Sequence, residues 1–275
     1  MNKPIYRHYA EQKWRSYDQL LISQRISQFN IVPDILPKFE PTADVKLHFR
    51  QKKFAPGDVV DSLVSENPPR LRVQVFNGGE RLVSIVVLDA DVPNPEEDSF
   101  FKRCHFMAAN IPLDPTNTSL PLSKIVASDQ LAVPWLAPFS QKGAPYHRLS
   151  IFLLEQTPGE KLDVAKLKEL YARQDESKFT TRFSLKSFRD KFHLKPFGFS
   201  MFRSVWDENT ADLMARHNMP GAETEFRPAR VYSLKPPIKP RGWEAKRQGP
   251  KYRQLWKYTK RIRGVSNGRG WTKRR

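Results

Sequence analysis

Residues 82–93 (LVSIVVLDADVP) decide the fold, because this valine- and isoleucine-rich run ended by Asp and Pro predicts a buried strand. Residues 104–111 (CHFMAANI) form a second apolar run that carries His105, and residues 149–154 (LSIFLL) form a third that follows His147. Asp89 and Asp91 are two residues apart, so their side chains should point to the same side of the strand. We therefore predict neighbouring strands of one sheet whose ends form a polar pocket from Asp89, Asp91, His105 and His147.

Further strands are expected on either side of this centre. Residues 71–76 alternate apolar and polar side chains, and residues 77–79 (NGG) read as a tight turn, which predicts a hairpin with residues 81–88. Residues 199–206 predict a last strand, and residues 45–49 also alternate. Strands at such short spacing, with few helices between them, favour a mainly β, antiparallel α+β domain with peripheral helices.

Four helices are predicted around the strands, over residues 9–29, 162–174, 183–192 and 207–217, with Ser184 as a possible N-cap. The first carries Trp14, Tyr17 and Leu21 on one stripe. This stripe either packs on its own domain or docks on a partner, and the sequence leaves both readings open.

Two segments have the composition of loops. Residues 31–70 contain six prolines and read as an extended connector, and residues 112–146 read as a long loop held down by Trp135 and Phe139. The expected organisation is therefore a helix and extended arm over residues 1–54, a domain over residues 55–217, and a tail over residues 218–275.

The charge of the chain is concentrated in this tail. The whole chain carries a net charge of +18, and residues 227–275 contain 17 Lys and Arg but one acidic residue, Glu244. The first 226 residues hold 30 basic and 28 acidic residues and are nearly neutral. A globular domain with so basic a tail predicts a polyanionic partner.

Aromatic residues alternate with the basic ones in the tail, and its prolines exclude long helices. Arg and Lys neutralise phosphates, whereas aromatic rings stack on unpaired bases, so we predict RNA binding. A nuclear localisation patch or a solubilising tail are the alternatives. The predicted RNA-binding residues are Arg241, Lys246, Arg247, Lys251, Arg253, Trp256, Lys257, Lys260, Arg261, Arg263, Arg269, Trp271, Lys273, Arg274 and Arg275.

Several function classes have no support in the sequence. The single cysteine, Cys104, excludes an internal disulfide and a cysteine-based zinc cluster. No run of 18 apolar residues occurs, so no membrane span is expected, and the N-terminus lacks the apolar region of a secretory signal. We find no phosphate loop, dinucleotide fingerprint or nucleophile motif, so we expect neither an enzyme nor a cofactor. No close-spaced histidine pair supports a metal at the four pocket residues.

The ordered motifs resemble those of the phosphatidylethanolamine-binding protein family. They are residues 89–93 (DADVP), His105 through Asn110, the His147-Arg148 pair before a strand, and the later residues 188–194 (FRDKFHL) and 202–207 (FRSVWD). The resemblance covers roughly residues 55–217 and implies an antiparallel β-sandwich. It also implies a pocket for phosphate-bearing head groups at Asp89, Asp91, His105 and His147.

The opening of the chain resembles one branch of this family. Residues 4–8 (PIYRH), Trp14 and residues 31–37 (IVPDILP) are similar to the fungal form found in the mitochondrial large ribosomal subunit, which carries an N-terminal extension. The resemblance implies a structural role near the central protuberance, with ribosomal RNA and neighbouring ribosomal proteins as partners and the mitochondrial matrix as the location.

The family pocket carries over only in part. Ala90 replaces the proline between the acids, Pro145 replaces the glycine before His-Arg, and Leu149 replaces an aromatic residue. We therefore expect a degenerate pocket in which a small ligand is unlikely and the polar groups hydrogen-bond one another. The alternative is a free phospholipid- or phosphate-binding regulator, and a nuclear RNA-binding protein is a third hypothesis.

Overall fold

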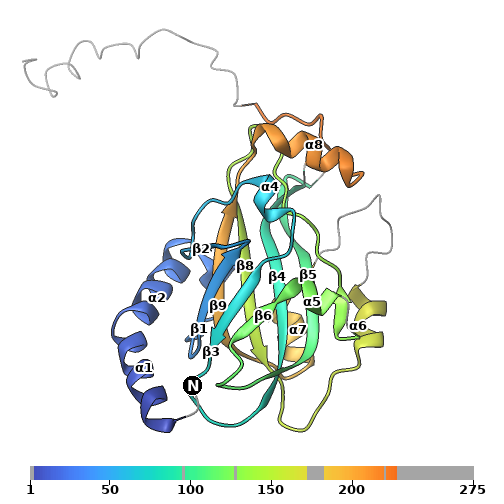
Figure 1. The fold of residues 1–275 in the computed structure, drawn as a ribbon. Coiled ribbons are helices and arrows are strands. Elements are labelled where there is room, and N and C mark those ends of the chain that lie inside the picture. The colour runs from blue at the N-terminus through green and yellow to red at the C-terminus, as the bar shows by residue number, and fades with distance from the viewer. Residues whose placement is uncertain (1–2, 95–96, 127–128, 172–182, 220, 228–275) are drawn as a thin grey trace, which may run out of the picture. The chain divides into compact units, whose positions relative to one another are not determined.

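Two antiparallel sheets form the framework of the protein (Figure 1). The computed structural model describes residues 3–94, 97–126, 129–171, 183–219 and 221–227. Its contacts divide the chain into Met1–Arg227 and Pro228–Arg275, and the second unit lies outside the described residues. The strands are β1 (Asp44–Phe49), β2 (Lys52–Phe54), β3 (Arg70–Gln74), β4 (Arg81–Asn94), β5 (Ser99–Leu113), β6 (Ser119–Pro121), β7 (Leu131–Val133), β8 (His147–Glu155) and β9 (Lys195–Ser204).

The helices cover the sheets and their ends. They are α1 (Pro4–Ser16), α2 (Asp18–Gln28), α3 (Ile31–Asp34), α4 (Ser62–Ser65), α5 (Leu122–Val126), α6 (Val164–Tyr171), α7 (Leu185–Lys191) and α8 (Glu208–Arg216). One sheet has the strand order β2-β1-β3-β6 and the other the order β7-β5-β4-β8-β9. The predicted fold class, mainly antiparallel β with peripheral helices, is confirmed.

The central strand β4 is buried on both of its faces. Val83, Ile85 and Val87 pack in the core between the two sheets, whereas Val86 and Leu88 pack in a second core beneath the helices. A strand with two buried faces needs a continuous apolar run instead of an alternating one. This explains why residues 82–88 lack a polar face and why they identified the centre of the fold.

The predicted hairpin between residues 71–76 and 81–88 is wrong. β3 pairs with β1 and β6 in the four-stranded sheet, whereas β4 pairs with β5 and β8 in the other sheet. The physical reason lies in the connection, where Val75 is buried in the core between the sheets and Phe76 in the core beneath the helices. Because Val75 and Phe76 are buried in different cores, the chain passes from one sheet to the other at this point instead of turning back as a hairpin.

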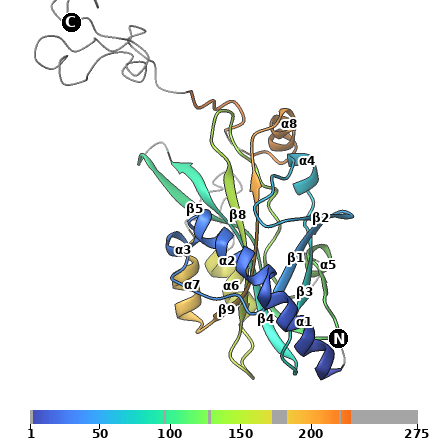
Figure 2. The same cartoon turned by 90° about the vertical axis from the view of Figure 1, so that its left-hand side faces the viewer.

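The N-terminal segment forms two helices instead of the single one expected over residues 9–29. The break falls at Tyr17, whose φ and ψ of −140° and −63° are not helical. Trp14, Ile22 and Ile26 of these helices are buried in the core. Trp14 packs against Phe76 with a ring separation of 5.3 Å. Figures 1 and 2 show α1 and α2 following one another along one side of the sandwich.

The expected arm over residues 1–54 is also part of the sandwich. β1 lies inside the four-stranded sheet, and its Val45, Leu47 and Phe49 are buried between the sheets. The expected domain boundary at residue 55 therefore cuts this sheet, because a proline-rich composition does not prevent short strands from pairing.

The loop expected over residues 112–146 contains β6, α5 and β7. It is held down as predicted, since Trp135 Nε1 donates to the carbonyl oxygens of Ser65 and Glu66 at 3.2 and 3.0 Å and Phe139 is buried with Leu213 of α8. Ser184 caps α7 as expected by accepting from Ser187 N. The predicted end of the helix over residues 162–174 lies outside the described residues.

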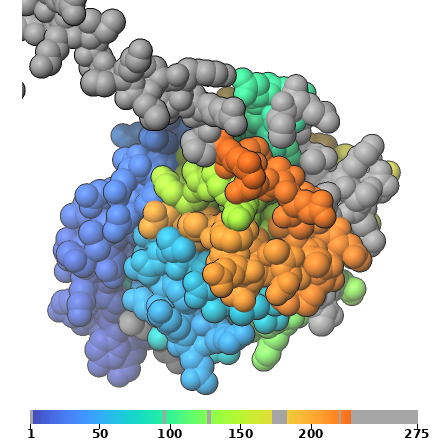
Figure 3. All heavy atoms as spheres, turned by 90° about the horizontal axis from the view of Figure 1, so that it is seen from above, coloured from blue at the N-terminus to red at the C-terminus, as the bar shows by residue number. Residues whose placement is uncertain are grey.

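The last helix closes one end of the sandwich. Asp207 caps α8 in a reciprocal capping box with Thr210. The Asp207 carboxylate also accepts hydrogen bonds from α4, namely from Ser62 N at 2.8 Å and Ser62 Oγ at 2.6 Å. Figure 3, which views this end from above, shows the α8 region in orange with the N-terminal helices in blue at the left-hand margin.

Candidate ligand pocket

A buried carboxylate, Asp89, lies at the centre of the predicted site. It is on β4 and is 1% exposed, and β4 pairs here with β8, whose first residue is His147. His147 Nδ1 lies 2.7 Å from Asp89 Oδ2, and both side chains are buried. The antiparallel pairing of β4 with β8 thus brings together two residues that are 58 positions apart in the sequence.

His105 completes the buried part of the site. It lies on β5, on the other side of β4, and its Nε2 is 3.9 Å from Asp89 Oδ2. Its Nδ1 donates to the carbonyl oxygen of Leu136 at 2.9 Å, which fixes the orientation of the ring. Asp89 therefore lies between two histidines, as the sequence predicted.

Asp91 belongs to a different interaction from the one expected. Its carboxylate accepts from Arg148 through N at 2.9 Å, Nε at 2.7 Å and Nη2 at 2.6 Å. The pairing of β4 with β5 shifts register between Asp89 and Val92. An irregular strand does not keep the strict alternation on which the prediction of two carboxylates facing one pocket rested.

The charges of the buried pair are mutually dependent. Burial raises the pKa of Asp89, but the charge and hydrogen bond of His147, the charge of His105 and the hydrogen bond from the Asp91 amide outweigh it, so that the pKa is lowered to about 2. Burial lowers the pKa of His147, yet the nearby Asp89 carboxylate outweighs this effect and raises it above the usual value. The pair is therefore an ion pair at mildly acidic pH, below the ordinary pKa of histidine.

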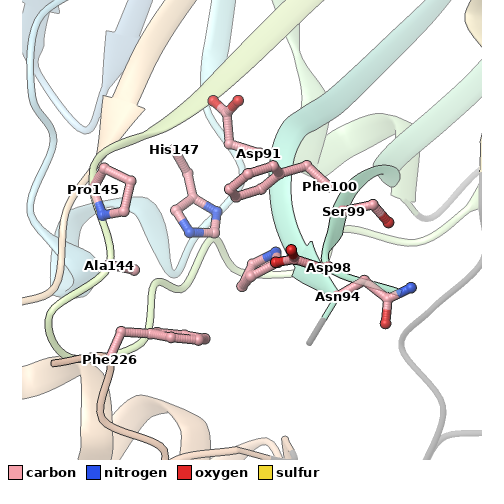
Figure 4. A pocket seen from close by; sticks show the side chains of 10 residues that line it. Asp91, Asn94, Asp98, Ser99, Phe100, Ala144, Pro145, His147 and Phe226 are labelled. Carbon is pink, nitrogen blue, oxygen red and sulfur yellow. The ribbon is translucent and has the colours of Figure 1, made fainter. Parts of the chain in front are cut away.

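A cavity of about 270 Å³ opens above this pair. Figure 4 shows the ring of His147 pointing into it, with Phe100 from the β5 side and Phe226 from the C-terminal segment. Asp89 and His105 do not line it and lie buried beneath. Its walls are formed by Asp91, Pro93, Asn94, Asp98, Ser99, Phe100, Ala144, Pro145, His147 and Phe226.

The composition of the walls disfavours an anion. They contain the carboxylates Asp91 and Asp98 and no Lys or Arg, so His147 is the one positively charged group among the lining residues. His147 already has its charge balanced by Asp89 at 2.7 Å. Asp91 has its charge balanced by Arg148 at 2.6 Å. A phosphate in this cavity would therefore meet the Asp98 carboxylate and no cation that lacks a partner carboxylate among the lining residues.

A second hollow of about 420 Å³ adjoins the cavity and shares Asp91, Phe100 and Pro145 with it. One wall comes from the N-terminal extension, namely Phe29, Asn30 and Asp34. The sequence signal for this part of the site was Arg148 of the His-Arg pair, which the prediction did not include among the site residues.

Arg148 joins the extension to the pocket. Besides Asp91, it donates through Nη1 to the Phe29 carbonyl oxygen and through Nη2 to Asp34 Oδ2, each at 2.7 Å. Burial raises the pKa of Asp34, but the bonds and charges of Arg148 and Lys102 lower it overall. Beside this bridge, the Arg203 guanidinium lies 5.4 Å from the centre of the Phe29 ring and 5.1 Å from that of Tyr146.

The C-terminal segment closes the opposite side of the cavity. Phe226 N donates to the Lys142 carbonyl oxygen at 2.8 Å, and Lys142 and Glu225 form an isolated parallel bridge. Gly143 makes this approach possible, because it has φ of +80° and a Cβ there would lie 1.9 Å from the Phe226 carbonyl oxygen. No sequence pattern marked Phe226 as a wall of the pocket.

The structure bears differently on the other predicted sites, which are the docking residues of the first helices and the RNA-binding residues of the tail. Trp14 is 3% exposed and packs in its own core, so its predicted role in docking is corrected, while Tyr17 and Leu21 are 65% and 40% exposed. The tail residues predicted to bind RNA, Arg241 through Arg275, lie outside the described residues. Within the described ranges no cluster of three metal-ligating side chains occurs, and none of the helices there is long and apolar enough to cross a membrane.

Two packed antiparallel sheets with a polar pocket at the ends of β4 and β8 define an antiparallel β-sandwich. A sequence profile described as phosphatidylethanolamine-binding protein matches residues 39–196. The chain belongs to the phosphatidylethanolamine-binding protein family. Among solved structures, the phosphatidylethanolamine-binding protein from Plasmodium vivax aligns over 67% of this chain and 97% of its own, with 18% identity and a TM-score of 0.51.

Two further relatives are similar to this chain in sequence. Large ribosomal subunit protein mL38 of Schizosaccharomyces pombe is 28% identical over 218 residues, which span 78% of this chain and 66% of that protein. Protein TERMINAL FLOWER 1 of Arabidopsis thaliana is 30% identical over 106 residues, 38% of this chain and 56% of that protein. The chain thus matches less than two thirds of the length of either relative.

Proposed function

We propose that this protein is a structural, non-enzymatic component of the large subunit of the mitochondrial ribosome, with neighbouring ribosomal proteins and ribosomal RNA as its partners. The observation that carries the proposal is the match to mL38 over 78% of the chain, which extends beyond the family region at residues 39–196. The similarity therefore includes sequence outside the shared pocket domain, as a shared assembly role requires.

The charge distribution supports a ribosomal RNA partner. Residues 227–275 hold 17 basic residues and one acid, interspersed with Tyr and Trp, whereas the preceding chain is nearly neutral. The Lys and Arg side chains neutralise phosphates and release counterions, and the aromatic rings stack on unpaired bases. In this proposal, location near the central protuberance and in the mitochondrial matrix follows from the same ribosomal role.

Sedimentation of tagged protein with mitochondrial large subunits tests the proposal. The full chain is expected to co-sediment with the large subunit and to crosslink to ribosomal RNA. Deletion of residues 227–275 should weaken assembly and reduce its sensitivity to salt, because fewer phosphate contacts release fewer counterions. Full-length protein that stays at the top of the gradient contradicts the ribosomal role, and a truncated chain that sediments like the full chain contradicts the role of the tail.

A free phospholipid- or phosphate-binding regulator is the second candidate, which the cavity above His147 favours. It predicts saturable binding of phosphoethanolamine in calorimetry, lost in His147→Ala and in His105→Ala. The composition of the walls argues against it, because Asp98 lines the cavity and the charge of His147 is already balanced by Asp89. Calorimetry without heat of binding would exclude this second candidate.

A further inference from the structure

Six large apolar side chains, five of them tyrosine or leucine, are exposed on α1, on α2 and at the break between them. Among the described residues these are half of the twelve large apolar side chains that are exposed. We call them the outer face of the N-terminal helices. Its members are Ile5, Tyr6, Tyr9, Tyr17, Leu20 and Leu21, which are 57%, 59%, 62%, 65%, 62% and 40% exposed.

Folding of this chain alone does not explain the outer face. α1 and α2 are already anchored on their inner side by Trp14, Ile22 and Ile26, which are at most 4% exposed. The helical period of 3.6 residues puts Tyr9 on the side of α1 away from Trp14, and Leu20 on the side of α2 away from Ile22. The helices thus have two apolar faces, and one of them is left for another molecule.

The fully exposed charges beside this face are basic. Lys3, Lys13, Arg15 and Arg25 are exposed, whereas Glu11 and Asp18 are only partly exposed. Glu11 is moreover paired with Arg15 at 2.7 Å. Lys3 Nζ lies 5.8 Å from the centre of the Tyr6 ring, which places a cation directly at the apolar surface. A complementary partner therefore presents carboxylates around an apolar centre.

We infer that the outer face binds an amphipathic helix of a neighbouring protein that carries acidic residues beside its apolar stripe. Tyr and aliphatic side chains with few charges are typical of the centre of a protein–protein interface, whereas RNA-binding surfaces are more polar and more positively charged. α1 and α2 follow one another along the side of the sandwich, so their outer sides form an elongated surface (Figure 2). A helix laid on it contacts apolar residues spaced three and four apart.

This inference rests on the proposed ribosomal role, and crosslinking in assembled subunits tests it. Full-length protein with a photoreactive benzoylphenylalanine at position 9 or 20 is assembled into large subunits in cells, purified by sedimentation and irradiated. The control position is Leu170, which is 49% exposed on α6. Positions 9 and 20 are expected to crosslink to one protein, in a segment with apolar residues at helical spacing and flanking acids.

Each other crosslinking result contradicts the inference. Adducts to RNA or to this chain itself assign the face to a different occupant, and absence of adducts in sedimenting subunits shows that the face is uncovered. In both cases the ribosomal role stands, because the protein still sediments with the subunit. Protein that does not sediment with the subunit contradicts the ribosomal role and this inference together.

Substitutions give an independent measurement with a matched control. The double variant Tyr9→Ser and Leu20→Ser should weaken association with large subunits by about tenfold or more, since exposed side chains at an interface centre carry most of its affinity. Lys13→Glu with Arg25→Glu should weaken it as well, because the partner is acidic. Leu63→Ser with Leu170→Ser removes similarly exposed side chains elsewhere and should leave association unchanged. Thermal unfolding checks that all variants fold, and unchanged association of either face variant contradicts the inference.

Discussion

Asp89 is an ionised carboxylate in a place from which water is excluded, and His147 and His105 make this possible. Burial alone would favour the protonated acid, but the charge of His147 at 2.7 Å overcomes the cost of desolvation. The same pair holds the end of β8 against β4. The polar residues that identify the family therefore also act as a structural link between two strands of this protein.

The contribution of this pair to stability depends on pH in a defined direction. The pKa of His147 is raised on folding, so the contribution is fully present below about pH 6.5 and is lost as the pH rises through the raised value. The pKa of Asp89 is lowered, so its contribution is present above about pH 3.9 and is lost as the pH falls towards about 2.

His147→Gln should lower the free energy of unfolding by about 3 kcal/mol near pH 6, because it leaves a buried carboxylate without its cation. The difference from the unsubstituted protein should shrink as the pH rises through the raised pKa of His147, because the contribution of its charge is lost there. Urea unfolding of both proteins at pH 6 and at a series of higher pH values measures this difference. A difference that does not change with pH would show that the charge of His147 contributes nothing.

Arg148 provides a second prediction at the scale of one residue. Its side chain is 14% exposed and ties Asp34 to Asp91. Arg148→Met should lower the free energy of unfolding by about 3 kcal/mol and increase amide hydrogen exchange in residues 18–34, since Asp91 loses its cation and Asp34 keeps only Lys102. Arg15→Met is the control, because the exposed pair of Arg15 with Glu11 is worth about 0.5 kcal/mol at most.

At the scale of elements, α1 and α2 depend on the apolar side chains of their inner face. Trp14→Ala should lower the free energy of unfolding by about 3 to 5 kcal/mol, as expected for a large buried aromatic residue. Trp14 Nε1 is buried and finds no hydrogen-bond partner among the residues that the structure describes, so Trp14→Phe should cost about 1 kcal/mol or less. Tyr17→Ala, at an exposed position, is the control in the same urea titration. Equal effects of the two Trp14 variants would contradict this assignment.

The close contact between Gly143 and the C-terminal segment can be tested with a pair of glycine substitutions, one at the contact and one away from it. Gly143→Val introduces a β-branched residue at positive φ and places its Cβ against the Phe226 carbonyl oxygen. Gly159→Val has the same backbone strain at φ of +84°, but nothing lies within 4 Å of its Cβ. Gly143→Val should therefore expose the Phe226 amide to hydrogen exchange, and Gly159→Val should not. Equal protection in both variants would contradict the clash.

The elements differ in how well their sequences predicted them. The strands β4, β5 and β8 and the cap of α7 could be predicted, because local apolar runs and a capping residue determine them. The passage of the chain from one sheet to the other between β3 and β4 could not be predicted. Residues 77–79 suit a tight turn, and the passage depends on the burial of Val75 and Phe76 in two different cores. The grouping of Asp89 with the two histidines was predicted, but the position of Asp89 and His105 beneath the cavity was not. The turning of Asp91 towards Arg148 follows from a strand irregularity that has no local sequence signal.

At the scale of the whole molecule, the extension and the family domain share one core. Trp14, Ile22, Ile26, Phe29 and Ile31 are buried together with residues of β4, β5 and β8. A fragment of residues 35–227 should therefore lose cooperative unfolding and bind a hydrophobic dye, whereas residues 1–227 should unfold in a single transition. Calorimetry on both fragments measures the cooperativity of unfolding. A cooperative transition in the shorter fragment would show that the extension is a separate unit.

The bridge from Arg148 to Asp34 limits how such an extension can be exchanged between relatives. The arginine belongs to the shared His-Arg motif, and the aspartate belongs to the added segment. A chimaera that transplants residues 1–34 onto another member of the family thus finds one half of this attachment already present in any recipient with the motif. The recipient protein must also offer packing partners for the rings of Trp14 and Phe29. In this protein those partners are Phe76 and Gly57, so the recipient needs suitable residues at the corresponding positions.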